Sequence, residues 1–197
     1  MVKEREMRWE TLDSEYVIRR PWLTARRDKV RLPTGAVNDE YYVLEYPDWV
    51  NVIAITADGM FVFVRQYRHG IAETSFEICA GVMEDGEQPV GVTVCKRYCF
   101  GLEDAVIKRE LEEETGYSGG RWTELMTLSQ NSSTCNNITH CFVAEGVEKK
   151  HMQHLDDTED IDVFLFTKDE VRGMLERNEI KQALMAAPLW RYICNGV

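Results

Sequence analysis

The sequence predicts an α+β fold, in which a mixed β-sheet carries helices on its faces and a small antiparallel β section precedes it. Three observations support this class. Alternating apolar stretches flank Asp58-Gly59, a dipeptide typical of a two-residue hairpin. A helical pattern ends at Gly116, and further strand and helix patterns follow it to the end of the chain. Such a succession is typical of layered α and β structure.

Residues 1–48 are predicted to form a separate section. Segments 16–19, 30–32 and 41–46 have the composition of strands, and Pro33-Thr34-Gly35 supplies a turn between the last two. A sheet this small buries little apolar surface by itself. We therefore expect it to pack on the main domain, on a second subunit, or on both.

The main domain, residues 49–197, contains the remaining elements. Strands are expected at residues 50–57, 60–67, 122–129, 139–145 and 161–166, and at the start of segment 77–87, which continues as a loop with Gly81 and Gly86. Helices are expected at about residues 102–115, from an N-cap at Thr167 to about Arg177, and at residues 180–191. Asn178 should end the second of these helices.

Composition and charge exclude several classes of protein. With 44% apolar and 29% charged residues, the chain has the profile of a soluble globular protein. No apolar stretch approaches the roughly 20 residues that cross a bilayer, and no signal-peptide core is visible, so we expect a cytoplasmic location. The six cysteines lack zinc-type spacing and are expected to be reduced thiols. The net charge of −11 argues against a nucleic-acid partner.

The segment 109–117, Arg-Glu-Leu-Glu-Glu-Glu-Thr-Gly-Tyr, contains the strongest functional signal. On a helix, Glu110 and Glu114 share a face, and Glu113 lies one step around the cylinder. Clustered carboxylates on a rigid element suit hard divalent cations such as Mg²⁺, which take oxygen ligands. Arg109 can hold a neighbouring carboxylate and so orient a metal ligand. The alternative is a solvated acidic helix face.

With a second stretch, this segment resembles the Nudix hydrolase signature, G-x5-E-x7-R-E-U-x-E-E-x-G-U, where U is a bulky aliphatic or aromatic residue. The matching positions are Gly81, Glu87, Arg109, Glu110, Leu111, Glu113, Glu114, Gly116 and Tyr117. The chain has twenty-one residues, 88–108, where the signature has seven, so we expect a fourteen-residue insertion, most naturally at residues 90–101. The resemblance implies the Nudix α/β/α sandwich.

Further features resemble the ADP-ribose pyrophosphatase branch of that family. They are the segment Val64-Arg65-Gln66-Tyr67-Arg68, the following Glu77, the N-terminal β section and the segment 179–183. The resemblance implies a homodimer in which residues 1–48 help to build a shared substrate site. It also implies a nucleoside diphosphate sugar as substrate, with ADP-ribose the first candidate. The loop 130–134 lacks the proline usual in that branch, so other sugars stay open.

The resemblance also assigns catalytic roles. Glu110, Glu113 and Glu114, with the carbonyl oxygen of Ala80, are expected to hold Mg²⁺, or Mn²⁺ in its place. Asp157 and Glu159 occupy the place from which the branch supplies a base for the attacking water. The alternative for these two residues is a solvated charged turn.

Substrate-binding roles are expected for four residues. Arg65 and Arg68 pair with phosphate groups, or else form surface salt bridges. Glu77 hydrogen-bonds the ribose or the adenine amine, or else caps the sheet edge. Gly81 lets the backbone approach a ligand. The aromatic residues Trp22, Tyr46 and Trp49 either stack on a base or belong to the core or a dimer interface, and His69, His140, His151 and His154 are expected to be structural or exposed.

Two functions from different classes follow. The first is a Mg²⁺-dependent hydrolase that splits a nucleoside diphosphate sugar, most simply ADP-ribose, into AMP and ribose 5-phosphate. The second is a Nudix-fold binding or regulatory module with weak catalysis, which the insertion within the signature suggests. An RNA-cap hydrolase would need a basic groove, and the charge of the chain argues against one.

Overall fold

The computed structural model describes residues 5–83 and 106–196, and these form two compact units. The first unit comprises Met1–Tyr46 and Ser129–Asn137, and the second comprises Pro47–Leu128 and Ile138–Val197. We expected a single boundary near residue 48, and the structure adds Ser129–Asn137 to the first unit. The roles expected of residues 1–48 in dimerisation and substrate binding stay predictions.

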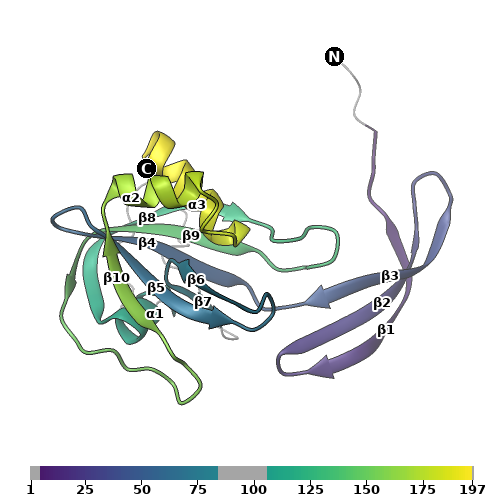
Figure 1. Ribbon diagram of the computed structural model, residues 1–197. Helices are drawn as coiled ribbons and strands as arrows, with labels where there is room; N and C mark the ends of the chain where they lie inside the picture. The colour runs from purple at the N-terminus through teal and green to yellow at the C-terminus, as the bar shows by residue number, and fades with distance from the viewer. Residues whose placement is uncertain (1–4, 84–105, 197) are drawn as a thin grey trace. The chain divides into compact units, whose positions relative to one another are not determined.

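The first unit is an antiparallel sheet of three strands, β1 (Glu10–Arg20), β2 (Leu23–Arg31) and β3 (Val37–Glu45), in that spatial order (Figure 1). The three predicted strands are confirmed, and each is longer than its sequence pattern indicated. The turn at residues 33–35 is confirmed as well. The amide of Gly35 donates to the carbonyl oxygen of Leu32 at 2.9 Å, and Gly35 adopts φ 86°, which only glycine tolerates easily.

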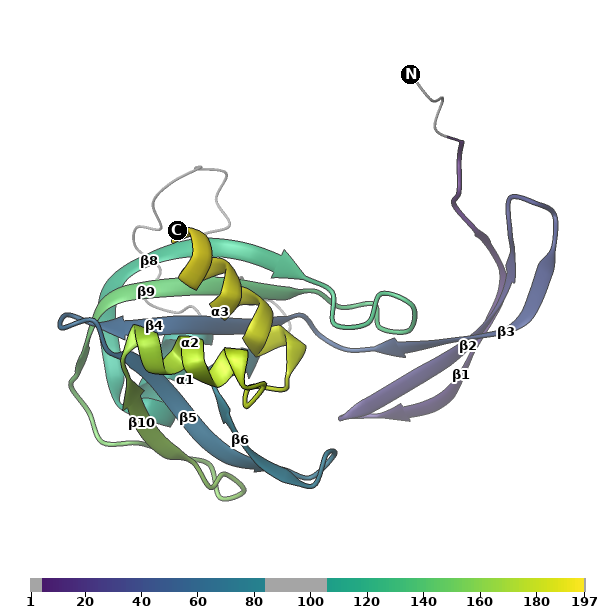
Figure 2. The ribbon, with the colours of Figure 1, turned by 45° about the horizontal axis from the view of Figure 1, so that its top comes forward.

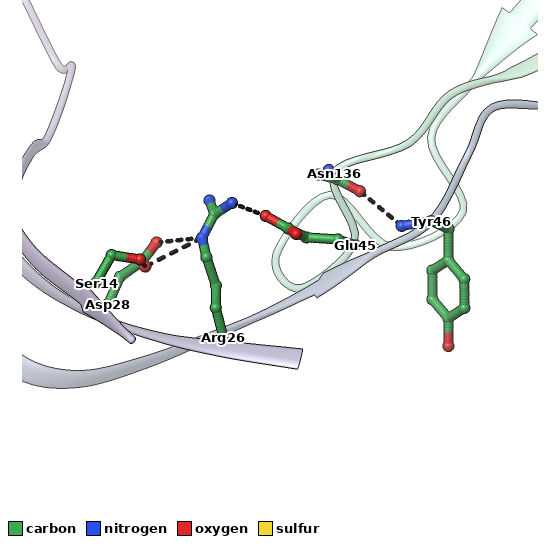
Figure 3. Close-up of polar contacts among 6 residues, drawn as sticks. All are labelled: Ser14, Arg26, Asp28, Glu45, Tyr46 and Asn136. Carbon is green, nitrogen blue, oxygen red and sulfur yellow. Dashed lines mark hydrogen bonds and ion pairs between the residues drawn. The ribbon is translucent and has the colours of Figure 1, made fainter. Parts of the chain in front are cut away.

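A charged network lies on this small sheet (Figure 3). The Nε atom of Arg26 donates to both carboxylate oxygens of Asp28 at 3.1 Å, and its Nη1 atom donates to Glu45. The hydroxyl of Ser14 also donates to Asp28, at 2.5 Å. Asp28 is buried, and a buried carboxylate is tolerable only when it is paired and hydrogen-bonded in this way. The network therefore ties all three strands together.

The end of β3 is bound to the distant segment Ser129–Asn137. The amide of Tyr46 donates to the side-chain oxygen of Asn136 at 3.0 Å, as Figure 3 shows. The amide of Leu44 donates to the carbonyl oxygen of Thr134 at 2.7 Å. These contacts explain why a loop from the second half of the chain belongs to the first unit.

In the described residues, the second unit contains a seven-stranded mixed sheet. Its strands are β4 (Trp49–Thr56), β5 (Phe61–Arg68), β6 (Glu73–Glu77), β7 (Ala80–Val82), β8 (Tyr117–Leu128), β9 (Thr139–Lys149) and β10 (Asp162–Phe166). The order is β10-β5-β4-β9-β8, while β6 pairs with β5 and β7 pairs with β4. Strands β4 and β9 are parallel, and the other pairs are antiparallel. The predicted hairpin is confirmed, since Gly59 turns the chain from β4 to β5 at φ 85°.

Helices cover both faces of this sheet. They are α1 (Val106–Thr115), α2 (Lys168–Glu176) and α3 (Ala183–Asn195), and α2 and α3 lie together on one face (Figures 1 and 2). Alternate residues of β4 serve the two layers: Val52 and Ala54 pack in one core cluster with α1, whereas Ile53 and Ile55 pack in another with α2 and α3. The α/β/α sandwich expected from the resemblance is confirmed.

Several predicted boundaries were right and others were wrong. The capping box of Thr167 and Glu170 opens α2, and Asn178 follows its end at φ 57°. Segment 77–87 was expected to begin as a strand and continue as a loop with Gly81, but β6 ends at Glu77 and Gly81 lies in strand β7. Strand β8 begins at Tyr117 rather than at residue 122, because the glycines at positions 119 and 120 adopt positive φ within the ladder and do not end it. Helix α3 begins at Ala183 rather than at residue 180.

Some predictions lie outside the described residues. These are Glu87, the insertion expected at residues 90–101, and the first turn of the helix expected from residue 102. In residues 5–83 and 106–196, no helix combines the length and the apolar character that crossing a bilayer requires.

Candidate active site

Helix α1 carries Glu114 into the interior of the second unit. Ile107, Leu111 and Glu114 lie at i, i+4 and i+7, so one face of the helix presents all three to the sheet, and all three are buried. Full burial of an Ile or Leu side chain contributes about 1.5–3 kcal/mol. Repulsion between carboxylates four residues apart opposes the helix by only about 0.2–0.5 kcal/mol. Apolar packing therefore imposes the position of the acidic residue.

Glu114 is a buried carboxylate with one oxygen that lacks a hydrogen-bond partner in the described residues. Its side chain is only 6% exposed, and no hydrogen-bond partner in the described part of the chain reaches its Oε2 atom. The buried thiol of Cys79 hydrogen-bonds the carboxylate. A buried carboxylate oxygen without a partner is costly, so such an oxygen indicates a missing cationic or donor group.

Gly81, on β7, lies directly against Glu110. A Cβ atom at position 81 would come within 2.5 Å of Glu110 Cγ and 2.8 Å of its Cδ. Strand β7 holds this position because Val50 of β4 pairs with Gly81, and Asn51 pairs with Ala80. We expected Gly81 to let a ligand approach the backbone, and in the structure the side chain of Glu110 makes this close approach. The predicted contact of Gly81 with substrate stays a prediction.

Burial and mutual repulsion raise the pKa of both helix carboxylates. The pKa of Glu110 rises to about 7 chiefly through desolvation, which Arg109 opposes and Glu113, Glu159 and Asp156 reinforce. The pKa of Glu114 rises to about 7 by desolvation as well. Cys79 and Arg68 oppose that rise, and Glu110 and Glu159 reinforce it. The site therefore favours a bound cation or bound protons.

These pKa values predict how the metal-free protein responds to pH. A carboxyl group with an unfolded pKa of 4.5 and a folded pKa of about 7 keeps its proton in the native state while the unfolded state loses it. Native stability should therefore fall as pH rises from about 4.5 to 7, by on the order of 3 kcal/mol for one such group. Urea unfolding in EDTA at several pH values would measure this. The control is Glu110→Gln/Glu114→Gln, whose curve should lack the loss, and parallel curves for the two proteins would contradict the assignment.

Arg109 lies between two of the predicted metal ligands. Its Nη2 atom is 3.2 Å from Glu110 Oε1, and its Nη1 atom donates to Glu113 Oε2 at 3.1 Å. Arg109 and Glu113 are half-exposed, whereas Glu110 is mostly buried. Arg109 thus contacts both carboxylates, and Glu113 lies at the exposed side of the site. A role of Arg109 in orienting a metal ligand stays a prediction.

Glu77 and Arg68 bind each other. The Arg68 Nε atom donates to Glu77 Oε1 at 2.9 Å, and Nε and Nη2 both contact Oε2. The hydroxyl of Ser75 donates to Glu77 Oε1 at 2.6 Å, and the Glu77 side chain is 1% exposed. Its hydrogen bonds to Glu77 raise the pKa of Arg68, and the charge of Arg68 acts on Glu114. Glu77 thus holds the guanidinium of Arg68 at a position from which its charge acts on Glu114.

Arg65 is placed differently. Its Nη1 atom lies 3.8 Å from Asp162 Oδ2, and its guanidinium lies over the ring of Phe76, 5.9 Å from the centroid. This agrees with the surface ion pair that was the alternative prediction. A role of Arg65 in binding phosphate stays a prediction.

The loop between β9 and β10 carries the two residues that were predicted as candidate bases, Asp157 and Glu159. The charge of Glu159 raises the pKa of Glu110, Glu114 and the Cys79 thiol, for which burial is the main cause. Asp156, which the sequence analysis did not single out, also acts on Glu110. Asp157 and Glu159 are both exposed. Among the main causes of the raised pKa values of Glu110 and Glu114, the charge of Glu159 appears and that of Asp157 does not. The role of either residue as a base stays a prediction.

The carboxylates suit a hard divalent cation, although in the described residues they do not form a complete set of metal ligands. In residues 5–83 and 106–196, no three or more His, Cys, Asp and Glu side chains are close enough together to hold a metal ion. Two carboxylates with raised pKa and one unpaired buried oxygen nevertheless form an oxygen-rich site that a cation would stabilise. The buried Oε2 atom of Glu114, which lacks a hydrogen-bond partner in the described residues, is the main evidence that a cation would suit this site.

Stacking of Trp22, Tyr46 or Trp49 on a base stays a prediction. Trp22 is 85% exposed, while Tyr46 and Trp49 are half-buried. Among the histidines, His140 lies 3.5 Å from Asp48 and His151 lies 3.2 Å from Glu112. Both are contacts away from Glu110 and Glu114, as the structural interpretation of the histidines predicted.

The chain is similar to several known proteins. Residues 9–44 match the family described as nucleoside diphosphate sugar hydrolase N-terminal domain. An ADP-ribose pyrophosphatase of Bacillus subtilis (strain 168) is 29% identical over 160 residues, 81% of this chain and 78% of that protein. A methanol dehydrogenase activator of Bacillus methanolicus is 32% identical over 171 residues, 86% of this chain and 84% of that protein.

A solved structure supports the fold. The crystal structure of an ADP compounds hydrolase superposes with a TM-score of 0.78 at 18% sequence identity, covering 98% of this chain and 100% of that one. At this identity the likeness concerns the fold, which agrees with the layered arrangement of β4, β9 and the three helices described above.

Proposed function

Because the chain belongs to the Nudix hydrolase family, in its ADP-ribose pyrophosphatase-like branch, we propose that it hydrolyses the pyrophosphate bond of a nucleoside diphosphate sugar. ADP-ribose is the first candidate substrate, and its products would be AMP and ribose 5-phosphate. The observation that supports this proposal most strongly is the buried Oε2 atom of Glu114, which has no hydrogen-bond partner in residues 5–83 and 106–196. Glu114 lies with Glu110 on a helix that matches the family signature.

A divalent cation completes the proposed site. Glu110, Glu114 and the carbonyl oxygen of Ala80 would hold it, with Glu113 at the rim. Magnesium is the proposed ion, and manganese is the alternative, because both accept oxygen ligands. A cation bound there neutralises phosphate charge and polarises the phosphorus under attack.

Side chains of the chain position the substrate. The fork between Arg68 and Glu77 fixes the guanidinium of Arg68, so that its charge is available to a phosphate oxygen next to the acidic site. Arg109 restrains Glu110 and Glu113. Such restraint is effective because a reacting group displaced by about 1 Å can lower the rate about 100-fold.

Glu159 is the proposed general base. Its carboxylate accepts a proton from the attacking water, whose oxygen becomes part of one phosphate while the other phosphate leaves with the bridging oxygen. Glu159 is preferred to Asp157 because its charge acts on Glu110 and Glu114. Asp157 is the alternative.

The first unit is proposed to form the contact between two copies of the chain. The sheet and the segments next to its strands expose many large apolar side chains: Trp9, Tyr16, Val17, Ile18, Trp22, Leu23, Val37 and Tyr42. A three-stranded sheet with such a surface indicates an interface that a partner covers. A cytoplasmic location is proposed as well, and the cysteines of the described residues, at positions 79, 135, 141 and 194, are free thiols, as in a reducing compartment.

The regulatory alternative is not favoured. One relative is named as an ADP-ribose pyrophosphatase and the superposed structure as an ADP compounds hydrolase, while the other relative is named as an enzyme activator. In the described residues, the carboxylates that a catalytically weak module could have lost, Glu110 and Glu114, are in place. A hydrolase is the function that these residues support best.

The proposal is tested by product analysis. The purified chain is incubated with ADP-ribose, other nucleoside diphosphate sugars and dinucleotides, with Mg²⁺, Mn²⁺ or EDTA, and the products are separated by ion exchange. We expect AMP and ribose 5-phosphate in equal amounts from ADP-ribose, and no reaction in EDTA. Labelled water would identify the phosphorus that is attacked. Failure to turn over any compound of the panel with either metal would refute the proposal.

A further inference from the structure

The acidic loop of residues 150–161 is fastened at its base to the C-terminal end of α1. The amides of Lys150 and His151 donate to the carbonyl oxygen of Gly116 at 2.9 and 3.1 Å. The amide of His154 donates to the carbonyl oxygen of Glu113 at 2.8 Å. The last carbonyl groups of a helix have no partner within the helix, and here the loop supplies the missing donors. Loop and helix end therefore form one hydrogen-bonded structure.

The side chain of Gln153 joins both ends of this loop to the helix. Its Nε2 atom donates to the carbonyl oxygen of Glu114 at 2.8 Å and to that of Ile161 at 3.0 Å. A carboxamide nitrogen carries two hydrogens, and both acceptors are carbonyl oxygens, so the full donor capacity of Nε2 is used. This one side chain closes residues 154–160 into a short loop whose ends are held together at α1.

The closed loop holds the proposed base. The amide of Glu159 donates to the carbonyl oxygen of Asp156 at 2.9 Å, and the Glu159 carboxylate accepts from the amide of Asp156 at 3.0 Å. The turn thus restrains the carboxylate of Glu159. Burial is the main cause of the raised pKa values of Glu110 and Glu114, and the charge of Glu159 adds to both. Repulsion between these like charges opposes the approach of the loop to the helix.

We infer that Gln153 is a positioning residue, whose two hydrogen bonds keep the carboxylates of loop 154–160 at the α1 site against their electrostatic repulsion. The inference rests on the proposed function, because it assigns the clamp to the loop that supplies the base. It assigns a role to a residue whose two hydrogen bonds go to backbone carbonyl groups and that would act through Glu159.

The test compares Gln153→Met, which keeps the length of the side chain but cannot donate, with Gln153→Lys, which restores a donor of similar reach. Met152→Ala is the matched control, because the neighbouring Met152 is 85% exposed. With ADP-ribose and Mg²⁺, Gln153→Met should lower kcat about 10- to 100-fold, as loss of a supporting partner commonly does. KM and the Mg²⁺ dissociation constant should change less than threefold. Gln153→Lys should recover most of kcat.

Hydrogen exchange gives a readout independent of activity. Amides of residues 155–161 should exchange at least tenfold faster in Gln153→Met than in wild type, while those of β4 and β9 stay protected. Met152→Ala should match wild type in exchange and in kcat.

Two results would overturn the inference: Gln153→Met indistinguishable from Met152→Ala, or faster loop exchange with unchanged kcat. If Gln153→Met failed to fold, Gln153→Asn, whose amide is too short to reach both carbonyl groups, would replace it. If the wild-type protein hydrolysed no substrate, the proposed function would fail, while the exchange data would still decide whether the clamp exists.

Discussion

Replacing Glu114 with Gln is expected to lower kcat/KM by about 1,000-fold, equivalent to about 4 kcal/mol of transition-state stabilisation. Glu114 is buried, its Oε2 atom lacks a partner in the described residues, and its neighbours Glu110 and Glu159 add negative charge. An amide of nearly the same size keeps the packing of α1 but removes the charge that would hold the cation. Steady-state kinetics with ADP-ribose and titration calorimetry with Mg²⁺ would measure both losses.

The same variant should fold at least as stably as wild type in EDTA. Removal of a buried carboxylate relieves desolvation and repulsion, so the urea midpoint at pH 8 should stay constant or rise. Glu112→Gln is the control, because Glu112 is on the same helix but half-exposed and contacts His151. That control should keep turnover within about twofold. Turnover by Glu114→Gln close to that of wild type would rule out Glu114 as a metal ligand.

Local sequence patterns predicted the elements whose causes are local. Asp58-Gly59 determined the hairpin, Thr167 and Glu170 determined the start of α2, and Gly116 determined the end of α1. Each depends on backbone conformations or hydrogen bonds within a few residues. The acidic face of α1 was likewise predictable, because helical spacing alone puts Glu110 and Glu114 on one side.

Contacts between distant segments could not be predicted in the same way. Gln153 meets Glu114 from 39 positions away, and Tyr46 meets Asn136 from 90 positions away. Nothing in the local pattern around Gln153 marks it as different from any other polar loop residue. Only the pairing of β8 with β9 and the return of the chain to β10 bring it to the end of α1.

The Arg68–Glu77 pair is a contact that the sequence did not predict. Each residue was given a role of its own: Arg68 in phosphate binding or a surface salt bridge, and Glu77 in a hydrogen bond to the substrate or at the sheet edge. Strands β5 and β6 pair so that Arg68 is opposite Glu73 and Val64 is opposite Glu77, and the long arginine side chain reaches back to Glu77. Ser75 adds a hydrogen bond to the same carboxylate. Knowledge of this register would have been needed to predict the fork.

Replacing Gly81 with Ala is expected to lower turnover about 100-fold and to destabilise the protein by about 1–3 kcal/mol. The new Cβ atom would lie 2.5 Å from Glu110 Cγ, well inside van der Waals contact, and β7 is held in place by its pairing with β4. Glu110 must therefore move, and its carboxylate leaves the position beside Glu114. Kinetics, Mg²⁺ titration and urea unfolding would measure the three consequences. Gly70→Ala is the matched control, because a Cβ atom there meets nothing within 4 Å.

A double-mutant cycle separates the steric effect of Gly81→Ala from the catalytic one. Glu110→Ala removes the Cγ and Cδ atoms that the new methyl group would meet, so Gly81→Ala should destabilise this background by less than about 0.5 kcal/mol. Activity should stay low in the double variant, since the carboxylate is absent. If Gly81→Ala were equally destabilising with and without the Glu110 side chain, the strain would lie in β7 itself. If Gly81→Ala kept normal Mg²⁺ affinity and turnover, the position of Glu110 against this glycine would have no part in catalysis.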